Sequence, residues 1–545
     1  MLRTWMREGN HWVWFNAMAV AISLLAVIGL ISFIIFKGMG HFWPKDIHAY
    51  TVQDGAGGSV QLFGELHRRS DRVEGNVKEG VTQVPQLLVK IGNRDLFGAD
   101  FKWVDEQAIS HDATPKDLIM IERYEWGNMY GRLKSVTLGD GMTVTGAQAW
   151  DTFQQLIERH TELHDQIVRI QKHEIGTINA SVEQLRLDRR RLELDNKLNE
   201  QAQAKLDEKR RQLDSDYQTL LAQMRQLEQT ASALGKAQVE IMTGEVVTLP
   251  IDKVVESIMP NAMTITEKLG HYFHRIWVFL SDDPREANTE GGIFPAIFGT
   301  VTLVFIMTVL VMPFGVVAAI YLREYAKDGL ITRAIRISVN NLAGVPSIVY
   351  GVFGLGFFVY VLGHNIDQLF YQEALPAPTF GTPGLLWAAL TLALLTLPVV
   401  IVSTEEGLAR VPRTMREGSL ALGATKIETL WHTVLPIASP AIMTGLILAI
   451  ARAAGEVAPL MLVGVVKLAP SLPVDAISPF IHLDRKIMHL GFHIHDVGFQ
   501  SPNVEAAQPL VYATAFFLVL IIVALNISAI TIRNRLRERF KSVDN

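Results

Sequence analysis

Six long apolar segments constrain this chain more than any other feature of its sequence. A helix of about 20 residues is needed to cross the hydrocarbon core of a bilayer, and each segment is at least that long. Five segments carry no charged residue, and the remaining one carries a single arginine and a single glutamate. They cover residues 12–36, 292–322, 342–363, 384–403, 437–466 and 509–532. The sequence therefore predicts an all-α polytopic membrane protein, with the first segment retained as an anchor because no small-residue cleavage site follows it.

The basic residues of the short connections predict how these segments cross the membrane. Connections 1–11, 323–336, 405–436 and the basic tail 533–545 together hold 15 Lys and Arg, whereas 363–383 and 467–508 together hold only 3. Connections rich in Lys and Arg remain on the cytoplasmic side. Both termini are therefore expected in the cytoplasm. Residues 37–291 would lie outside it, in the periplasm.

The long outer stretch changes character along its length. Residues 45–150 are polar and rich in glycine turns, with short alternating runs at 59–66, 86–91 and 117–124 that predict strands. Residues 151–235 follow a helical pattern, and 236–260 look β-rich again, with a returning strand expected at 239–249. An α+β region at 37–282 with a helical insertion is therefore expected between the anchor (1–36) and a membrane core of five further spans (283–532).

A seven-residue repeat of leucine and isoleucine predicts a coiled coil inside this insertion. The repeat consists of Ile178, Leu185, Leu192, Leu206, Leu213, Leu220, Leu227 and Leu234, with Asn199 at the interrupted position. The matching second positions are polar from 189 to 210. Residues 177–234 contain no Gly or Pro and as one helix would extend roughly 87 Å. Both a single long helix and an antiparallel hairpin that turns near residues 196–203 fit this pattern.

Arg452 and Glu456 are the charged pair within the fifth segment, and their spacing would place them on one helix face. A charged residue at mid-membrane costs about 2.5–3.5 kcal/mol on insertion scales, so such residues usually form pairs or line a water-filled path. Two interpretations remain open. The pair either locks the helix bundle together, or it lines a pathway for an anion.

Segment 405–436 is a charged connection that reads as a short helix over 417–423, a turn at Gly423, and a second helix up to Pro436. It is either a docking surface for a soluble partner or a plain solvated connection. Its stretch 418–425 nearly matches a phosphate-binding loop, but Ala424 stands where lysine is required and no strand precedes it. Nucleotide binding on this chain is therefore excluded, and any ATP hydrolysis must come from another subunit.

Composition excludes several other functions. The sequence has no cysteine, which rules out disulfides, thiolate metal sites and cysteine nucleophiles, and its net charge of −5 argues against nucleic acid as a partner. His160 and His164 have the spacing of a metal pair, but Glu162 does not fit a zinc-protease motif, and a plain helix surface is expected. A cluster of histidines at 482–495 is expected to be incidental, with a metal or proton-sensing role as the alternative. No catalytic motif appears with its required context.

Residues 417–436 resemble the EAA loop of ABC-importer permeases: Glu-Ala-Ala, three residues, Gly, nine residues, then Ile-x-Leu-Pro. The chain keeps Glu417, Gly423, Leu435 and Pro436 at that spacing and departs from it at Gly418, Ser419 and Thr433. The resemblance implies a type I importer fold and a loop that seats in an ATPase subunit. It places the following residues in that loop: Glu417, Gly418, Ala421, Gly423, Leu435 and Pro436.

Three further stretches, at 284–297, 341–351 and 451–460, resemble the phosphate-specific subfamily, its A-type permease in particular. The resemblance implies a phosphate importer in the bacterial inner membrane, in which a C-type permease, two ATPase subunits and a periplasmic phosphate-binding protein are the partners. ATP and magnesium would bind the ATPase, and this chain would need no cofactor. Arg452 would meet the anion in transit, with Glu456 beside it. A permease for sulfate or molybdate, and a membrane scaffold or sensor that uses the coiled coil, remain alternatives.

Overall fold

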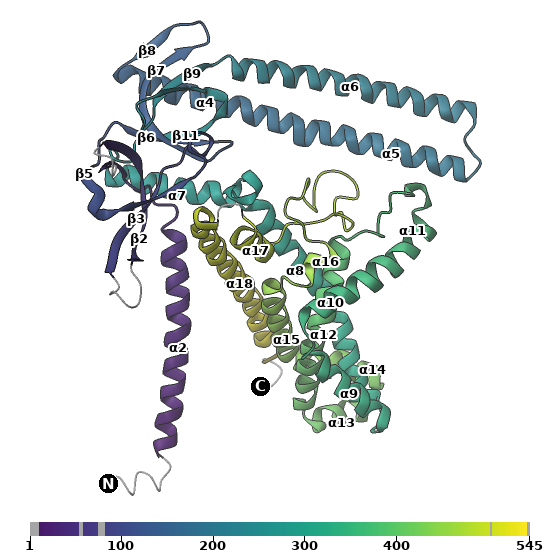
Figure 1. Cartoon of the computed structure of the whole chain (residues 1–545). Helices are drawn as coiled ribbons and strands as arrows, with labels where there is room; N and C mark the ends of the chain where they lie inside the picture. Colours follow the sequence, from purple (N-terminus) through teal and green to yellow (C-terminus); the bar gives the residue numbers. More distant parts are fainter. Residues whose placement is uncertain (1–9, 54–57, 75–81, 502–503, 542–545) are drawn as a thin grey trace. The chain divides into compact units, whose positions relative to one another are not determined.

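The computed structural model describes residues 10–53, 58–74, 82–501 and 504–541, which form two compact units (Figure 1). One unit, Phe42–Phe279, contains all the larger sheets among the described residues and is called the α+β unit. The other combines Met1–His41 with Leu280–Asn545 and is called the helical unit. The chain thus leaves the helical unit after its first helix and returns to it for the remaining ones.

Two antiparallel sheets build the α+β unit. The first has the strand order β4 (Phe101–Asp105), β3 (Thr82–Lys90), β2 (Ser59–Glu74), β1 (Ile47–Gln53) and β5 (Ile109–Ala113). The second has the order β10 (Val246–Pro250), β9 (Gly235–Glu240), β7 (Asn128–Leu138), β6 (Leu118–Arg123) and β11 (Val254–Ile258), with β8 (Thr143–Thr145) paired to β7. The short helices α3 (Arg94–Phe97), η1 (Glu106–Ala108) and η3 (Ile251–Lys253) connect strands. Alternating apolar residues such as Ile119, Ile121 and Val239 form the core on one face of the second sheet.

Strands occur at each of the three runs predicted between residues 59 and 124, and the first is much longer than expected. The single strand expected at 239–249 is wrong, because this stretch forms the β9–β10 hairpin. Its turn closes with a 2.9 Å bond from Ile241 N to Glu245 O and uses Gly244 at a φ of 81°. Glycine takes this left-handed conformation without steric cost. Because β9 pairs with β7, the preceding helices are an insertion within the second sheet.

The inserted helices form a long antiparallel hairpin (Figure 1). Helix α4 (Ala147–Arg169) continues through a π-helical turn (Ile170–Glu174) into α5 (Ile175–Leu194), and α6 (Glu200–Ser232) returns beside it. The chain reverses where Asn196 takes a φ of 55°, and Asn199 then caps α6 by accepting a 2.8 Å bond from Ala202 N. Of the two shapes compatible with the heptad repeat, the structure therefore has the hairpin.

Six helices of the described chain are long and apolar enough to cross a membrane. The first three are Trp12–Met39 within α2 (Asn10–Met39); Phe294–Tyr325, formed by α8 (Phe294–Ile320) and a π turn (Tyr321–Tyr325); and Ser347–Phe370, formed by α10 (Ser347–Phe353), a π-helical segment (Gly354–Gly363) and α11 (His364–Phe370). The other three are Leu385–Arg410, which is α12; Lys426–Gly455, formed by α14 (Lys426–Thr429), a π turn (Leu430–Val434) and α15 (Leu435–Gly455); and Ala507–Arg535 within α18 (Val504–Lys541). Further helices of the unit are α9 (Leu330–Leu342), α13 (Arg413–Ala421), α16 (Leu460–Val463) and α17 (Leu490–Phe499). The protein is thus polytopic and helical in its membrane part.

Helix α12 is the most buried of the six and packs on both α8 and α15. Small residues allow these close contacts: a Cβ added at Gly315 would lie 2.6 Å from Val400 Cγ1, and one at Gly445 would lie 2.6 Å from Ser403 Cβ. Small residues at helix interfaces are typical of membrane proteins, where dispersion contacts replace the hydrophobic effect. Helix α2 contacts α18, where Phe33 meets Tyr512 at 5.6 Å between ring centroids.

The fifth span differs from the sequence prediction. The helix begins at Lys426, eleven residues before the expected start, and ends at Gly455 instead of continuing to residue 466. Pro436 does not end the preceding helix, because it lies in the first turn of α15, where proline is tolerated. After Gly455 the backbone becomes extended at Glu456, and Pro459 precedes the short helix α16. Arg452 and Glu456 therefore do not share one helix face.

Candidate functional site

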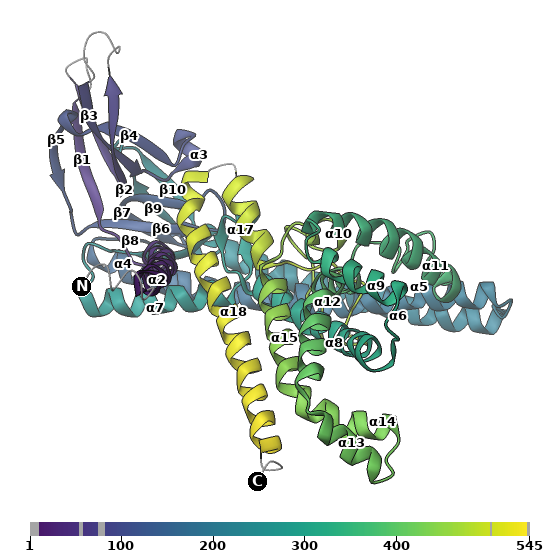
Figure 2. The ribbon, with the colours of Figure 1, turned by 90° about the horizontal axis from the view of Figure 1, so that it is seen from below.

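Residues 411–436, called here the α13–α14 loop, lie at one end of the helical unit, and α17 lies at the other (Figure 2). Between α13 and α14 the chain turns at Gly423, whose φ of 89° favours glycine over any residue with a Cβ. Thr425 and Glu428 then form a capping box that starts α14. The first helix thus covers 413–421 rather than 417–423, and the turn is where the sequence predicted it.

A charge cluster fixes this loop to the end of the second span. Arg416 of α13 pairs with Glu324, and Lys426 donates a hydrogen bond to the backbone carbonyl of the same residue. The ammonium of Lys426 also lies 4.4 Å from the ring centroid of Tyr325. Within the loop, the hydroxyls of Ser419 and Thr429 are 3.0 Å apart. The sequence does not predict the pairing of Glu324 with Arg416, because residues 92 positions apart share no periodic pattern.

The six residues assigned to this loop fall into two groups. Glu417, Gly418, Ala421 and Gly423 are exposed on α13 and its turn, whereas Leu435 and Pro436 are half-buried at the start of α15. Beside the exposed group, Leu422 is 91% exposed, and Leu420 and Ile427 are exposed too. The loop therefore presents an apolar tip on a rigid, charged base, a surface suited to docking with another protein.

Arg452 and Glu456 remain neighbours although the helix ends between them. The Nε of Arg452 lies 3.5 Å from Oε1 of Glu456, and their side chains are 34% and 20% exposed. This is a salt bridge with a long contact rather than a strong bidentate pair. The arginine thus keeps N–H donors that the glutamate does not occupy, in a partly accessible position.

Two of the sequence stretches singled out earlier pack directly on each other. A Cβ added at Gly351 would lie 2.7 Å from Pro459 Cα, so stretch 341–351 approaches stretch 451–460 at backbone distance. The hydroxyl of Tyr350 donates a 2.6 Å bond to the carbonyl of Leu342, which closes the turn before α10. The segment that follows α15, at Pro459, is therefore held against the start of the third span.

The third stretch, 284–297, starts with a small hairpin of β12 (Pro284–Arg285) and β13 (Glu290–Gly291), joined by the short helix η4 (Glu286–Asn288). Asn288 is buried there and donates to Lys467 O at 2.9 Å and to Asp496 Oδ2 at 3.2 Å. Lys467 Nζ pairs with the same carboxylate oxygen at 3.0 Å. Stretch 284–297 is thus anchored to α17 and to the segment after α16.

Two of the histidines at 482–495, His482 and His489, make structural contacts, whereas both ring nitrogens of the buried His493 have no hydrogen-bond partner in the described part of the chain. His482 and Arg485 both pair with Asp475, and His489 caps α17. His493 is 2% exposed, and burial lowers its pKa to about 4, with Lys467 adding to the effect and Asp496 opposing it. Among the described residues, no group of three or more His, Cys, Asp and Glu has the geometry for a metal ion.

His160 and His164 also depart from the expected helix surface. His160 is buried beneath Tyr124, and its ring centroid lies 5.9 Å from that of His164. Burial first, and then the charge of His164, lowers the pKa of His160 below its ordinary value. The helix packs this face on the second sheet, which the four-residue spacing of the two histidines in the sequence does not reveal.

Comparison with known proteins gives a family match. The sequence model of the "binding-protein-dependent transport system inner membrane component" family matches residues 311–542. The chain is 41% identical over 175 residues to "Phosphate transport system permease protein PstA 1" of Mycobacterium tuberculosis (strain CDC 1551 / Oshkosh), which covers 32% of this chain and 52% of that protein. The chain thus spans about half the length of this relative.

Two further relatives are matched over more of their length. "Probable phosphate transport system permease protein PstA" of Methanocaldococcus jannaschii is 29% identical over 279 residues, 51% of this chain and 85% of that protein. "Probable ABC transporter permease protein YqgI" of Bacillus subtilis (strain 168) is 31% identical over 235 residues, 42% of this chain and 74% of that protein. The chain therefore belongs to the family of inner membrane permeases of binding-protein-dependent ABC transport systems, a family of permeases rather than enzymes.

Proposed function

We propose that this chain is the permease subunit of an ATP-driven importer that carries inorganic phosphate across the bacterial cytoplasmic membrane. The observation that carries the proposal is the 41% identity with a mycobacterial relative that is named as a phosphate permease. The archaeal relative of similar name extends the match to 279 residues. The close packing of Gly351 on Pro459 supports the proposal further. It brings together stretches 341–351 and 451–460, two of the three stretches that resemble phosphate permeases.

The proposed partners follow from the permease role. A C-type permease would complete the pore, two copies of an ATPase subunit would bind ATP and magnesium, and a periplasmic phosphate-binding protein would deliver the anion. Both chain termini would lie in the cytoplasm and residues 37–291 in the periplasm, in line with the basic residues of the connections. This chain itself would carry no cofactor.

The α13–α14 loop is the proposed contact with the ATPase. Leu422 and the exposed face of α13, which carries Glu417, Gly418 and Ala421, would seat in a groove of that subunit. Because Arg416 and Lys426 attach the loop to Glu324, motion of the docked loop would move the second and fifth spans together. Gly423, Leu435 and Pro436 would then shape the loop rather than touch the partner. ATP binding would in this way rock the two permeases between inward- and outward-facing states.

Arg452 is the proposed contact for the anion in transit. Its partly exposed guanidinium has donors that Glu456 does not occupy, and a guanidinium fork suits phosphate oxygens. Glu456 would hold the arginine between transport events, which keeps the affinity low enough for release. The helix end at Gly455 supports this role, because interrupted helices form the substrate sites of many transporters.

We also propose that α5 and α6 pack as an antiparallel coiled coil in the periplasm. The heptad repeat supports this packing, and Leu185 of that repeat is buried. The ion pairs along the two helices, such as Arg186 with Glu183, are exposed to water and would therefore add little to stability. Apolar contacts within the repeat would therefore supply most of the hairpin's stability.

Labelled-phosphate uptake tests the proposal. The chain and its partner subunits are expressed in cells that lack their own phosphate importer of this kind, and sulfate and molybdate uptake are measured in parallel. We expect wild type to restore phosphate uptake alone. Restored sulfate or molybdate uptake without phosphate uptake would show that the substrate assignment is wrong. If no uptake returns although the complex assembles, the transport role itself is refuted.

Variants of Arg452 test the pathway assignment in the same cells. Arg452→Ala should abolish uptake at normal membrane levels, Arg452→Lys should retain part of it because the charge remains, and Arg333→Ala, at an exposed arginine of α9, should leave it unchanged. Normal transport by Arg452→Ala would mean that the pair with Glu456 only stabilises the bundle.

A further inference from the structure

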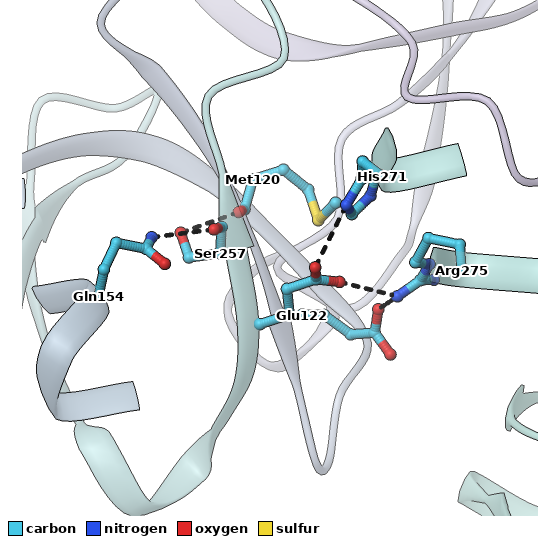
Figure 3. Close-up of polar contacts among 7 residues, drawn as sticks. Met120, Glu122, Gln154, Ser257, His271 and Arg275 are labelled. Carbon is cyan, nitrogen blue, oxygen red and sulfur yellow. Dashed lines mark hydrogen bonds and ion pairs between the residues drawn. The ribbon is translucent and has the colours of Figure 1, made fainter. Parts of the chain in front are cut away.

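Helix α7 (Ile265–Ser281) of the α+β unit directs its charged side toward the protein (Figure 3). Arg275 pairs with Glu122 of β6, and its Nη1 also lies 3.3 Å from Oε2 of Glu256 on β11. His271 Nδ1 lies 3.3 Å from the other oxygen of Glu256. One side of the helix is therefore fixed to the second sheet by ion pairs.

Each charged group in these contacts has a partner of opposite charge. Burial raises the pKa of Glu256, but the hydrogen bond with His271 and the charge of Arg275 outweigh that effect and hold the pKa below its ordinary value. Burial alone would lower the pKa of Arg275, but the carboxylates of Glu122 and Glu256 outweigh it and raise this pKa above its ordinary value. The charged side of α7 thus has its binding partners within the α+β unit, and the helix cannot turn that side to water without breaking them.

The opposite side of α7 is apolar and exposed. Ile265, Leu269, Phe273 and Trp277 follow one another at intervals of four residues and therefore lie on one face, and they are between 41% and 74% exposed. An amphipathic helix of a soluble domain places such a face on the core and its charges in solvent. Helix α7 does the reverse, so its apolar face requires an apolar environment from outside the unit.

Chain connectivity places a membrane close to this helix. The first span ends at Met39, and Phe42, only three residues later, is buried against Phe279 of α7 with 5.1 Å between ring centroids. Three residues of extended chain reach about 10 Å. Trp43 meets Tyr272 at 5.9 Å, so two aromatic contacts connect α7 to the first residues after the span. Helix α7 is therefore anchored to chain that has just left the bilayer.

We propose that α7 is an interfacial helix that lies along the membrane–water boundary, with Ile265, Leu269, Phe273 and Trp277 inserted among the lipids. A helix of 17 residues is about 26 Å long, too short to span and of the length of many helices that lie flat on bilayers. Phe273 and Trp277, with Trp43 and Tyr272 beside them, belong to the aromatic types that gather at this boundary. The proposal depends only on the six spans lying in a membrane and not on the identity of the substrate.

Such an arrangement has a structural consequence. The second sheet holds α7 through Glu122 and Glu256, so lipid contact along α7 would hold the whole α+β unit against the bilayer surface. The long α5–α6 hairpin extends from the same sheet. A helix that fixes the tilt of that sheet would also fix the direction in which the hairpin points.

Site-directed fluorescence tests the proposal directly, because the chain has no cysteine of its own. Leu269→Cys and Phe273→Cys carry the label on the apolar face. Leu194→Cys, at the far end of the hairpin, is the matched control, because Leu194 is 43% exposed and Leu269 41%. Each full-length variant is labelled with a polarity-sensitive fluorophore in lipid nanodiscs. Quenching is then measured with bromine on the lipid acyl chains and with iodide in the water.

We expect the labels at 269 and 273 to be quenched by brominated lipid and protected from iodide, and the label at 194 to show the reverse. Adding Trp277→Glu should weaken the lipid quenching of the Leu269→Cys label. Iodide quenching at 269 and 273 as strong as at 194 would place α7 in water and overturn the proposal. Protection from both quenchers would also overturn it, because the face would then be covered by protein.

Discussion

Replacing Arg275 with methionine provides a direct measure of how strongly the second sheet holds α7. Methionine fills much of the same volume but removes the guanidinium that contacts Glu122 and Glu256. The side chain of Glu122 is only 5% exposed, so its charge loses this partner without gaining water. The change therefore isolates the electrostatic part of the contact.

The magnitude follows from the burial of each group. Removing one partner of a buried ion pair costs about 3–5 kcal/mol, most of it from the charge left behind. Glu256 and Arg275 are each about a quarter exposed, and water reduces their share, so we expect a loss near the lower limit, about 3 kcal/mol. For a unit as large as Phe42–Phe279, this corresponds to a fall in Tm of about 6–12 °C.

Protease challenge of the full-length protein over a temperature series measures this effect, with fragments of the α+β unit identified by mass. Arg159→Met is the matched control, because the Arg159–Glu162 pair is more than half exposed and should contribute less than about 1 kcal/mol. Glu122→Met combined with Arg275→Met should lose less stability than Arg275→Met alone, since the double variant also removes the buried carboxylate that Arg275 neutralises. If Arg275→Met and Arg159→Met unfold at the same temperature, or the double variant is the least stable, the reasoning is refuted.

Three further outcomes are expected. The pKa of Glu256 is lowered in the folded protein, so its contribution to stability is present above pH 4.5 and disappears as the pH falls below that value. Unfolding curves at pH 3–7 should show this loss of stability. In Arg275→Met the loss between pH 7 and pH 3 should be smaller. Gly351→Val should lower both membrane levels and phosphate uptake, because its Cβ would lie 2.7 Å from Pro459 Cα, whereas Gly356→Ala, which meets no atom within 4 Å, should change neither. Leu422→Asp should leave the amount of permease unchanged but prevent co-purification of the ATPase subunit, since it places a charge on the exposed tip of the α13–α14 loop.

The membrane spans and the turn at Gly423 could be predicted because their signals are local. A charge-free run of more than 20 residues has few other folds available, and a glycine at the end of a short amphipathic run indicates a left-handed turn. The hairpin was one of two shapes that the heptad repeat allowed. Its reversal at Asn196 and Asn199 depends on the cap and left-handed backbone that these asparagines provide, which the repeat itself does not encode.

Other parts depend on contacts between distant residues and escaped prediction. The fifth helix ends at Gly455, where Glu456 becomes extended, although the apolar pattern continues to residue 466. Hydropathy records the residue types but not where the backbone stops being helical. The attachment of Arg416 to Glu324 is invisible for a similar reason, because each is an ordinary charge near the end of a span until the fold brings them together.

Helix α7 shows most clearly what a periodic pattern leaves undetermined. Its apolar stripe would look the same if it faced the core, since periodicity gives the angle between two faces but not which one meets the protein. The side of α7 that meets the protein is determined by Glu122 and Glu256, two carboxylates on neighbouring strands. Glu122 is far from α7 in sequence, and Glu256 is separated from it by a turn. They attract Arg275 and His271 to the sheet, and the aromatic face must then point away. The same ion pairs that stabilise the α+β unit thus direct Phe273 and Trp277 outward, where a bilayer can receive them.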